Sequence, residues 1–599
     1  MTAPNRNTLW ARTFVAELEA AGIDAVCLAP GSRSTPLTVA FAESDLAVFS
    51  HLDERSAAFF ALGRAKRTGK PTPVVCTSGT AAANFHPAVV EASQARVPML
   101  LLTADRPPEL RDSGANQTVD QEKLYGDAVR WYADLAEPEA DDRKLRYLRT
   151  TAARAVAEAT GVPAGPVHLN FPFRKPLEPT EVPGDVPEDF ADAHPLAAEG
   201  RDGPFVRTAR GAAELDAADL QEVRRALADA ERGLVVVGPA DNPAPDRDAL
   251  AALADATGFP VLADPLSGHR FGHGRNGDGA PLAVGGYDGY LDAVADAWPD
   301  PDVVVRFGAS PTSKVLRNYL EAADARQFLV DPAGGWREAT YTATDLLVAD
   351  PTRLAERVAS ELDSAGSASA GDAADAGTST WRDRFADAEE TYWSLVRDAR
   401  AERLFEGGVL STVAARLPDP ATVMVSNSMP VRDLDRFGEP RAADVTVLGN
   451  RGASGIDGIT STGLGAGSAT DDPLVIVTGD LAYYHDMNGL LALARCGVDA
   501  TIVEVNNDGG GIFHMLPIEE FDPPFTEQFR TPHGLDFEAT GDLYDFDFER
   551  VSDLDALAEA FDDSVASDGT QVLEVRTDAA ESHGFRDELA ERVADALGE

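Results

Sequence analysis

Short runs of apolar residues alternate along the chain with longer, alanine-rich segments of helical composition. In the first part of the chain each apolar run stops at small or turn-forming residues, as Ala25–Leu28 stops at Pro30-Gly31 and residues 73–77 stop at Ser78-Gly79. A strand that ends in a turn and is followed by a helix is the unit of a parallel sheet covered by helices. The pattern predicts further strands at 97–103, 167–171, 234–237, 261–263, 303–307, 327–330, 423–426, 445–448, 474–478, 501–505 and 571–575. The chain is therefore predicted to have an α/β fold of doubly wound parallel sheets.

Two segments without this alternation divide the chain into three blocks. Residues 178–205 are rich in Pro, Glu, Asp and Gly, which predicts a linker. Residues 364–380 are small and polar without periodicity, which predicts a flexible linker. We therefore expect three α/β domains, at residues 1–180, 205–362 and 381–599.

The charge of the chain excludes several classes of partner. The 599 residues include 52 Lys and Arg and 100 Asp and Glu, which gives a net charge of −48. Such a surface repels nucleic acid phosphates and anionic lipids, so we expect neither a nucleic acid nor a membrane partner. The acidic residues are scattered through the chain rather than gathered in one tail. This distribution favours adaptation of the whole surface to high salt over an acidic patch for a basic partner.

The N-terminus and the cysteines indicate a cytoplasmic protein. Residues 1–10 contain no apolar run of the kind found in signal peptides, and no stretch approaches 18 consecutive apolar residues. Cys27, Cys76 and Cys496 are too few and too scattered for a disulfide framework or a CxxC metal site.

Polar residues follow two neighbouring predicted strands of the last block. Gly479-Asp480 comes after the strand at 474–478, and a run from Asn506 to Gly511 comes after the strand at 501–505. Both clusters are expected at the carboxyl ends of parallel strands, where open α/β sheets bind ligands. The side-chain oxygens suit Mg²⁺, and the glycines let backbone amides approach a phosphate. Plain strand-end turns are the alternative, which the spacing and strand context together disfavour.

The two clusters resemble the motif of thiamine-diphosphate enzymes, in which GD is followed by NN about 27 residues later. In most of these enzymes the residue after GD is a glycine, whereas this chain has Leu481 there. One subfamily carries GDL at this place. The resemblance implies three ligands for Mg²⁺, or Mn²⁺, on the diphosphate of the cofactor: Asp480, Asn507 and the Gly509 carbonyl.

Thiamine chemistry also needs a carboxylate that protonates the aminopyrimidine ring of the cofactor, and Glu54 is the candidate. It lies in the HLDER stretch that follows the apolar segment 46–49 of the first block. Partial burial would raise the pKa of such a glutamate enough to keep a proton available. The alternative is an ordinary charge in the first turn of a helix.

Longer motifs narrow the resemblance. They are PGSRSTPL at 30–37, DRPPEL at 105–110, GANQ at 114–117, NSMPVR at 427–432 and NRGASGIDG at 450–458. These stretches resemble the 2-succinyl-5-enolpyruvyl-6-hydroxy-3-cyclohexene-1-carboxylate synthase family of menaquinone biosynthesis. The resemblance implies pyrimidine-binding, central and diphosphate-binding domains. It also implies thiamine-diphosphate-dependent decarboxylation of 2-oxoglutarate, followed by 1,4-addition of the succinyl-semialdehyde carbanion to isochorismate.

The resemblance implies roles for individual residues as well. Both substrates are dicarboxylates, and arginine matches carboxylate geometry best. The implied substrate-binding residues are Ser32, Arg33, Arg106, Gln117, Lys314, Ser428, Arg432 and Arg451. The implied cofactor-binding residues are Glu54, Ile456, Gly479, Asp480, Asn507, Ile512 and Phe513. Some relatives have a second cation directly after the lysine, where this chain has Val315; the contact is then lost or passes to Arg317. Solvated charges and ordinary core packing are the alternatives for these positions.

The family resemblance also implies self-association. In this family the cofactor lies between the first block of one subunit and the third block of another, so a dimer or a tetramer is expected. Two other functions stay open at this point: another thiamine-dependent lyase or synthase, and a non-catalytic homologue. The GDL and RGASGIDG stretches disfavour the first, and the joint presence of Glu54, Asp480 and Asn507 disfavours the second.

Overall fold

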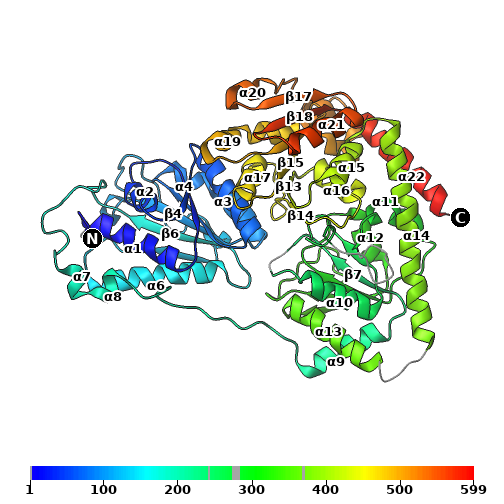
Figure 1. The fold of residues 1–599 in the computed structure, drawn as a ribbon, viewed down its shortest axis with the longest axis horizontal. Helices are drawn as coiled ribbons and strands as arrows, with labels where there is room; N and C mark the ends of the chain where they lie inside the picture. The colour runs from blue at the N-terminus through cyan, green and yellow to red at the C-terminus, as the bar shows by residue number, and fades with distance from the viewer. Residues whose placement is uncertain (1–2, 241–242, 273–282, 367–371, 599) are drawn as a thin grey trace. The chain divides into compact units, whose positions relative to one another are not determined.

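A computed structural model describes residues 3–240, 243–272, 283–366 and 372–598 (Figure 1). The described residues form three six-stranded sheets, and the strand pairs within them are parallel. Strands buried on both faces read as continuous apolar runs, as in the fully buried strand Met99–Asp105. The prediction of three doubly wound α/β sheets is confirmed.

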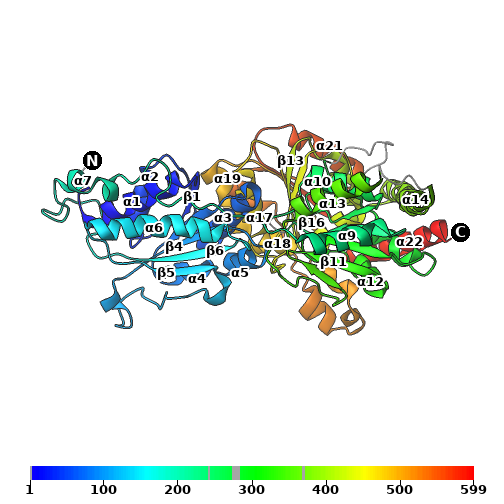
Figure 2. The same cartoon turned by 90° about the horizontal axis from the view of Figure 1, so that it is seen from below.

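The first sheet has the strand order β2-β1-β3-β4-β6-β5. Its strands are β1 (Ala25–Leu28), β2 (Ala47–Ser50), β3 (Thr72–Cys76), β4 (Met99–Asp105), β5 (Trp131–Asp134) and β6 (Pro166–Pro172). The helices between them are α1 (Arg6–Ala20), α2 (Thr35–Ala42), α3 (Glu54–Thr68), α4 (Thr80–Asn84), α5 (His86–Gln94) and α6 (Asp142–Ala159), with the 3-10 turns η1 (Pro108–Leu110) and η2 (Gly126–Ala128). Helices α1, α2 and α6 cover one face of this sheet, and α4 and α5 lie on the other (Figure 2).

The second sheet has the order β12-β11-β10-β7-β8-β9. Its strands are β7 (Gly233–Val237), β8 (Val261–Ala263), β9 (Ala283–Val284), β10 (Val303–Phe307), β11 (Arg326–Val330) and β12 (Asp345–Leu347). One face packs on α9 (Ala217–Ala228), α10 (Arg247–Thr257) and α13 (Pro351–Gly366). The other packs on α11 (Tyr287–Val294), α12 (Lys314–Ala322), α14 (Asp372–Glu402) and α22 (Ala579–Leu597).

The third sheet has the order β14-β13-β15-β16-β18-β17. Its strands are β13 (Ala421–Val425), β14 (Val445–Leu448), β15 (Leu474–Gly479), β16 (Thr501–Asn506), β17 (Asp547–Val551) and β18 (Gln571–Arg576). Its helices and turns are α15 (Glu406–Arg416), α16 (Met429–Phe437), α18 (Asp480–His485), η4 (Gly511–Met515), η5 (Pro517–Glu520), η6 (Phe525–Arg530), α20 (Ala539–Tyr544) and α21 (Leu554–Val565). Helices α15, α16 and α21 share one apolar core with the strands.

The chain divides into two compact units that do not follow the sequence blocks. One unit holds the first sheet up to Arg210 together with 450–471 and 485–499, and the other holds the second and third sheets. The two inserted segments carry α17 (Ile459–Gly467), the 3-10 turn η3 (Met487–Leu490) and α19 (Leu491–Cys496). Helix α17 packs along α3 of the first sheet. Segments of the last sequence block therefore complete the unit built around the first sheet.

Both expected linkers contain helices. Within 178–205 the chain forms α7 (Phe190–Ala193) and α8 (Pro195–Ala198), and Arg149 of α6 donates to the carbonyls of Ala197 and Ala198. The segment is thus fastened to the first unit. In the region expected as a flexible linker, α13 continues to Gly366 and α14 begins at Asp372, while 367–371 lie outside the described residues. Alanine-rich composition favours helix there, although it offers no apolar periodicity.

Candidate active site

The carboxyl ends of β15 and β16 bring Asp480 and the loop after Asn506 together. These neighbouring strands are paired as far as Gly479 and Val505, so the residues that follow leave the sheet side by side. Asp480 Oδ2 accepts a hydrogen bond from the Gly509 amide at 2.8 Å, and Oδ1 accepts one from the Leu481 amide at 2.6 Å. Burial raises the pKa of Asp480, and these hydrogen bonds oppose the rise.

Asn507 adds a side-chain amide with one bonded end and one open end. Its Nδ2 donates to Glu406 Oε1 at 2.8 Å, while its Oδ1 is buried and has no hydrogen-bond partner in the described part of the chain. An unsatisfied buried acceptor costs free energy unless a ligand completes it. A carboxylate and an orphaned amide oxygen at one loop fit a hard divalent cation that also takes phosphate oxygens.

Gly509 completes the predicted ligand set, and its backbone requires glycine. Its φ is +146°, and a Cβ there would lie 2.1 Å from the Arg530 carbonyl oxygen. Its own carbonyl accepts from the Gly511 amide at 3.2 Å, a contact within the loop. Among the described residues no group of three His, Cys, Asp or Glu side chains could hold a metal.

His533 also contacts Asp480, and sequence analysis did not single it out. Its Nε2 lies 3.2 Å from Asp480 Oδ2, and its amide donates to Asp508 Oδ1 at 3.0 Å. The histidine therefore joins the two acidic residues of the site. It lies 53 residues beyond Asp480, in a loop without a motif, so no local signal could have found it.

Glu406 is a second residue that sequence analysis missed. It is the first residue of α15 and lies behind Asn507, with 3% of its surface exposed. Burial, followed by the charge of Asp433, raises the pKa of Glu406 to about 7. In the sequence it opens an ordinary helical segment, EGGVL, with nothing that links it to the NN motif 101 residues later.

Glu54 lies at the carboxyl edge of the first sheet. It is the first residue of α3, behind the N-cap Asp53, whose side chain accepts from the amides of Arg55 and Ser56. The side chain of Glu54 is half-buried. Burial, and secondly the charge of Glu54, raise the pKa of the Cys76 thiol well above its usual range, so the carboxyl group lies near the end of β3.

Two predicted arginines lie together at the same edge. Arg33 is only 6% exposed, and its Nη1 donates to the Phe173 carbonyl at 2.7 Å. Burial, followed by the nearby charge of Arg106, lowers the pKa of Arg33. Arg106 Nε donates to the Asn116 carbonyl at 2.9 Å. Two cations held close together at a sheet edge form a site for a carboxylate.

Gln117 and Ser32 lie beside these arginines. Gln117 has φ +54°, and it exchanges hydrogen bonds with Ser78: its Nε2 donates to the Ser78 carbonyl, and Ser78 Oγ donates to its carbonyl, each at 3.1 Å. Ser32 is exposed in the turn after β1, next to Arg33. A non-glycine residue with positive φ is uncommon and often marks a functional loop.

Ser428 and Arg432 lie after β13 of the third sheet. Ser428 caps α16 with φ +69°, a left-handed conformation that is rare for a serine. Arg432 Nη1 donates to the Ser428 carbonyl at 2.6 Å. Arg432 lies in α16, because Met429-Pro430 begins the helix directly after the cap.

Lys314 is the exposed first residue of α12, after the N-cap Ser313. Arg317 is the alternative cation, and its Nε donates a hydrogen bond to the Ser313 carbonyl at 3.3 Å. Val315, next to the lysine, packs against the apolar core of the second sheet.

The predicted apolar residues are half-buried. Ile456 precedes α17, and Ile512 and Phe513 lie in η4 directly after the glycine run. Phe513 packs edge-on against Phe529, with ring centroids 5.5 Å apart. Arg451 is also half-buried.

The predicted site residues fall into two sets, one in each compact unit. The unit of the first sheet holds Ser32, Arg33, Glu54, Arg106, Gln117, Arg451 and Ile456. The other unit holds Lys314, Ser428, Arg432, Gly479, Asp480, Asn507, Gly509, Ile512 and Phe513.

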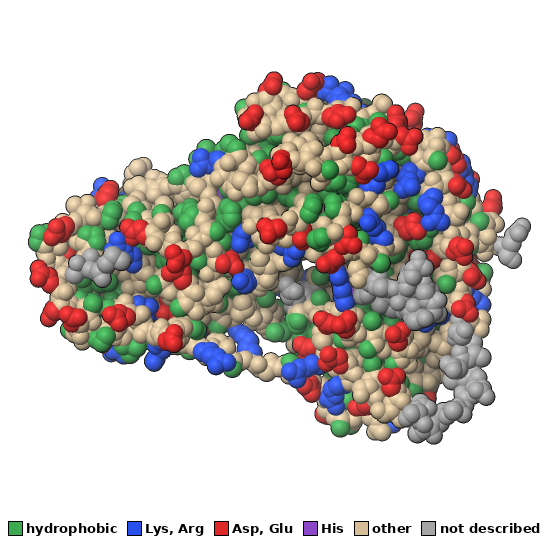
Figure 3. Space-filling view, in the orientation of Figure 1, with side chains coloured by type: hydrophobic (Ala, Val, Ile, Leu, Met, Phe, Trp, Pro, Cys, Tyr) green, Lys and Arg blue, Asp and Glu red, His purple; other side chains and the backbone are tan. Residues whose placement is uncertain are grey.

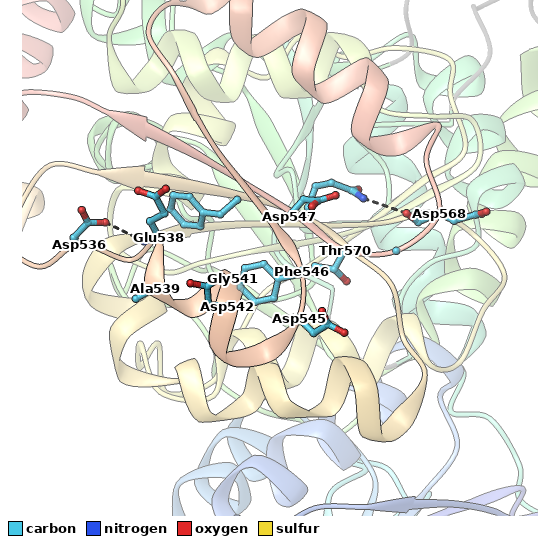
Figure 4. A pocket seen from close by; sticks show the side chains of 13 residues that line it. Asp536, Glu538, Ala539, Gly541, Asp542, Asp545, Phe546, Asp547, Asp568 and Thr570 are labelled. Atoms are coloured by element: carbon cyan, nitrogen blue, oxygen red, sulfur yellow. Dashed lines mark hydrogen bonds between the residues drawn. The ribbon is translucent and has the colours of Figure 1, made fainter.

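A pocket of about 810 Å³ lies elsewhere on the third sheet (Figure 4). Its walls include Asp545 before β17, Asp547 at the start of β17 and Asp568 before β18. These residues lie at the amino ends of their strands, opposite the edge where parallel sheets bind ligands. Its carboxylates also repel anionic substrates, so the pocket does not compete with the site at Asp480.

Three family models match the chain in the order of its sheets. "Thiamine pyrophosphate enzyme, N-terminal TPP binding domain" matches residues 10–124, "Middle domain of thiamine pyrophosphate" matches 201–425, and "Thiamine pyrophosphate enzyme, C-terminal TPP binding domain" matches 446–575. The chain is also similar along its length to a solved structure, the thiamine diphosphate-dependent 4-hydroxybenzoylformate decarboxylase of Rhodococcus jostii RHA1. That likeness has a TM-score of 0.68 and 17% identity over 95% of this chain and 99% of the other, and it bears on the fold alone.

Curated relatives cover the whole chain. The 2-succinyl-5-enolpyruvyl-6-hydroxy-3-cyclohexene-1-carboxylate synthase of Haloarcula marismortui is 66% identical over 100% of both chains. The protein of that name from Halobacterium salinarum is 62% identical over 99% of both chains. The protein of that name from Roseiflexus castenholzii is 48% identical over 96% of this chain and 97% of its own.

Proposed function

The chain belongs to the 2-succinyl-5-enolpyruvyl-6-hydroxy-3-cyclohexene-1-carboxylate synthase family of thiamine-diphosphate enzymes, and from this premise we propose how its residues carry out the reaction. The enzyme is a transferase of menaquinone biosynthesis. It decarboxylates 2-oxoglutarate and adds the remaining four-carbon unit to isochorismate. The observation that carries this function is the 66% identity over the full chain.

We propose that Asp480, Asn507 and the Gly509 carbonyl hold Mg²⁺ or Mn²⁺ on the cofactor's diphosphate. The orphaned Asn507 Oδ1 and the buried Asp480 carboxylate support this assignment. When bound, the cofactor supplies a thiazolium ring that accepts the electron pair released by decarboxylation. Gly479, Ile512 and Phe513 line the cofactor on this side, where the half-buried apolar side chains exclude water.

We propose Glu54 as the carboxyl group that would exchange a proton with the aminopyrimidine ring of a bound cofactor. Its place at the start of α3, half-buried beyond the N-cap Asp53, supports this role. Ile456, in the segment before α17, would contact the bound cofactor with its apolar side chain. Both residues belong to the unit of the first sheet.

The arginines bind the substrate carboxylates. In a chain with a net charge of −48, two dicarboxylates need local cations to offset the repulsion from the rest of the protein. Arg33 and Arg106, with Gln117 and Ser32 beside them, form the site for isochorismate. The remaining carboxylates are met by Ser428, Arg432, Arg451 and Lys314. Preorganised cations of this kind orient the reactants and stabilise developing charge.

The assembly follows from the family arrangement of the cofactor between two subunits, so we propose that the active form is a dimer or a tetramer. We assign residues 1–180, 205–362 and 381–599 to the pyrimidine-binding, central and diphosphate-binding domains. None of the helices in the described ranges is long and apolar enough to cross a membrane. We propose a cytoplasmic enzyme without membrane or nucleic acid partners.

We also propose adaptation of the surface to high salt. Acidic side chains are spread over the face shown in Figure 3 rather than gathered in one patch. At molar salt the Debye length falls to about 3 Å, which screens the repulsion between them.

The test of the function is the loss of isochorismate absorbance in molar KCl with Mg²⁺, thiamine diphosphate and 2-oxoglutarate. We expect loss only when every component is present, together with release of CO₂. Release of CO₂ from 2-oxoglutarate without loss of isochorismate would instead indicate a decarboxylase. Neither signal from folded protein would indicate a non-catalytic homologue.

A further inference from the structure

Glu406 is buried where several elements of the third sheet meet. Its Oε1 accepts from Asn507 Nδ2 at 2.8 Å, just after β16, and from Thr577 Oγ1 at 3.3 Å, just after β18. Its backbone amide donates to Ser582 Oγ at 3.3 Å, near the start of α22. The carboxyl group is therefore held by groups that follow two strand ends, and the backbone of the same residue is held by a helix.

This contact decides which way the Asn507 amide faces. An amide side chain has a donor end and an acceptor end of nearly the same shape, so packing alone does not orient it. The carboxylate of Glu406 has only acceptor oxygens, and its Oε1 accepts from Asn507 Nδ2. A flipped amide would set two oxygens against each other, so Asn507 Oδ1 must point away from Glu406.

The loop after β16 also constrains the space around this amide. A Cβ at Gly511 would lie 2.5 Å from Asn507 Nδ2, so only glycine leaves room for the amide in this orientation. The opposite end, Oδ1, is buried and has no hydrogen-bond partner among the described residues. The amide is therefore fixed at its nitrogen and open at its oxygen.

Stability alone does not explain a glutamate at this position. Taking a carboxylate out of water costs free energy, and the neighbouring charges of Asp433 and Asp480 add to the cost. A leucine would fill the same buried volume without that cost. The acceptor oxygen that Glu406 offers to Asn507 is what an apolar side chain could not supply.

We propose that Glu406 is a positioning residue that holds the Asn507 amide so that Oδ1 faces the divalent cation. The inference rests on the proposed metal site and adds the residue behind it. Partners that orient a ligand from behind typically change metal affinity about 10- to 100-fold when they are removed.

The experiment measures binding of Mn²⁺ to the full chain with thiamine diphosphate, from the electron paramagnetic resonance signal of free Mn²⁺ in molar KCl. Glu406→Leu keeps the buried volume and removes the acceptor, and we expect Mn²⁺ affinity to fall at least about tenfold. Glu406→Gln keeps an oxygen acceptor on a side chain of the same length, and we expect its affinity to stay within about threefold of wild type. Circular dichroism in the same buffer checks that each variant is folded.

Thr577→Val is the matched control, because Thr577 bonds the same oxygen of Glu406 and its side chain makes no hydrogen bond to Asn507 in the described part of the chain. We expect it to bind Mn²⁺ like the wild type. The inference is overturned if Glu406→Leu binds Mn²⁺ as tightly as the wild type, or if Glu406→Gln loses as much as Glu406→Leu, because charge rather than orientation would then matter. If the wild-type protein binds no Mn²⁺ in the presence of the cofactor, the proposed metal site itself is overturned. If the wild type binds Mn²⁺ and Glu406→Leu binds it equally well, only the positioning role is overturned.

Discussion

Helices α3 and α17 cross with backbone against backbone, and a single methyl group should separate them. A Cβ at Gly63 of α3 would lie 1.9 Å from the Thr462 carbonyl oxygen, and one at Gly465 of α17 would lie 2.0 Å from the Phe60 carbonyl oxygen. Both obstacles are main-chain atoms of helices, which cannot turn aside as a flexible side chain does. The perturbation is therefore Gly63→Ala.

The geometry sets the expected magnitude. Ordinary contact begins at 3.4 Å, so the new methyl group would lie about 1.5 Å too close and one helix must move. Overpacking of this kind costs about 1–3 kcal/mol. Because a helix backbone has to shift rather than a flexible side chain, we expect a cost near the upper end, about 3 kcal/mol. Alanine recovers about 1 kcal/mol over glycine inside a helix. The net loss in the free energy of unfolding is then about 2 kcal/mol.

The assay is urea unfolding in molar KCl, followed by circular dichroism and compared with Gly584→Ala. Gly584 lies in α22, where an added Cβ meets nothing within 4 Å. The same substitution there keeps the helix gain of up to about 1 kcal/mol without the packing cost. Gly63 and Gly584 lie in different compact units. The urea midpoint of each variant is therefore compared with the wild-type midpoint for the unit that carries the substitution. Because α3 begins at Glu54, we also expect Gly63→Ala to lower activity.

The double variant Gly63→Ala with Gly465→Ala tests the same crossing. Once one methyl group has separated the helices, the second should cost less. The double variant should therefore lose less free energy of unfolding than the sum of the losses of the two single variants. A Gly63→Ala protein that unfolds at the same urea concentration as the wild type, or at a higher one, would refute this account of the crossing.

Four further outcomes are expected. Glu54→Gln should leave Mg²⁺ and cofactor binding largely intact and reduce decarboxylation at least about 100-fold, as CO₂ release measures; full activity would remove Glu54 from the mechanism. Arg33→Ala should raise the KM for isochorismate at least about tenfold and leave CO₂ release from 2-oxoglutarate nearly unchanged, and equal losses in both would contradict the assignment. Burial raises the pKa of Asp486 from 3.8 to about 6. Between pH 4 and pH 6 the native state therefore binds more protons than the unfolded state, and the free energy of unfolding should fall as the pH rises through this range. Asp486→Asn, which still accepts from the Ser461 amide, should remove that slope in urea titrations, and an unchanged slope would assign it to other groups. Dialysis to low salt should cost the protein structure, and unchanged circular dichroism there would contradict adaptation to high salt.

The sequence predicted the central strands of every sheet because their signal is local. Strands such as Val261–Ala263 and Val303–Phe307 are apolar runs that end at turns, and they appear with the bounds expected. The edge strand β14 was also predicted, but the edge strands β12 and β17 were missed because they carry no such run. β17 is largely exposed and reads DFERV, and β12 is three residues long. An edge strand is recognised by the partner that it pairs with, which the sequence does not contain.

The same division holds in the candidate active site. The sequence by itself singled out Asp480, Asn507 and Gly509 as candidates, because strand-end residues at fixed spacing form a recognisable motif. Only the tertiary structure brought Glu406 and His533 to them, across 101 and 53 residues of chain. It also decided that segments 450–471 and 485–499 complete the unit of the first sheet. Such contacts depend on which surfaces bury one another when the whole chain folds, and local residue patterns do not encode that choice.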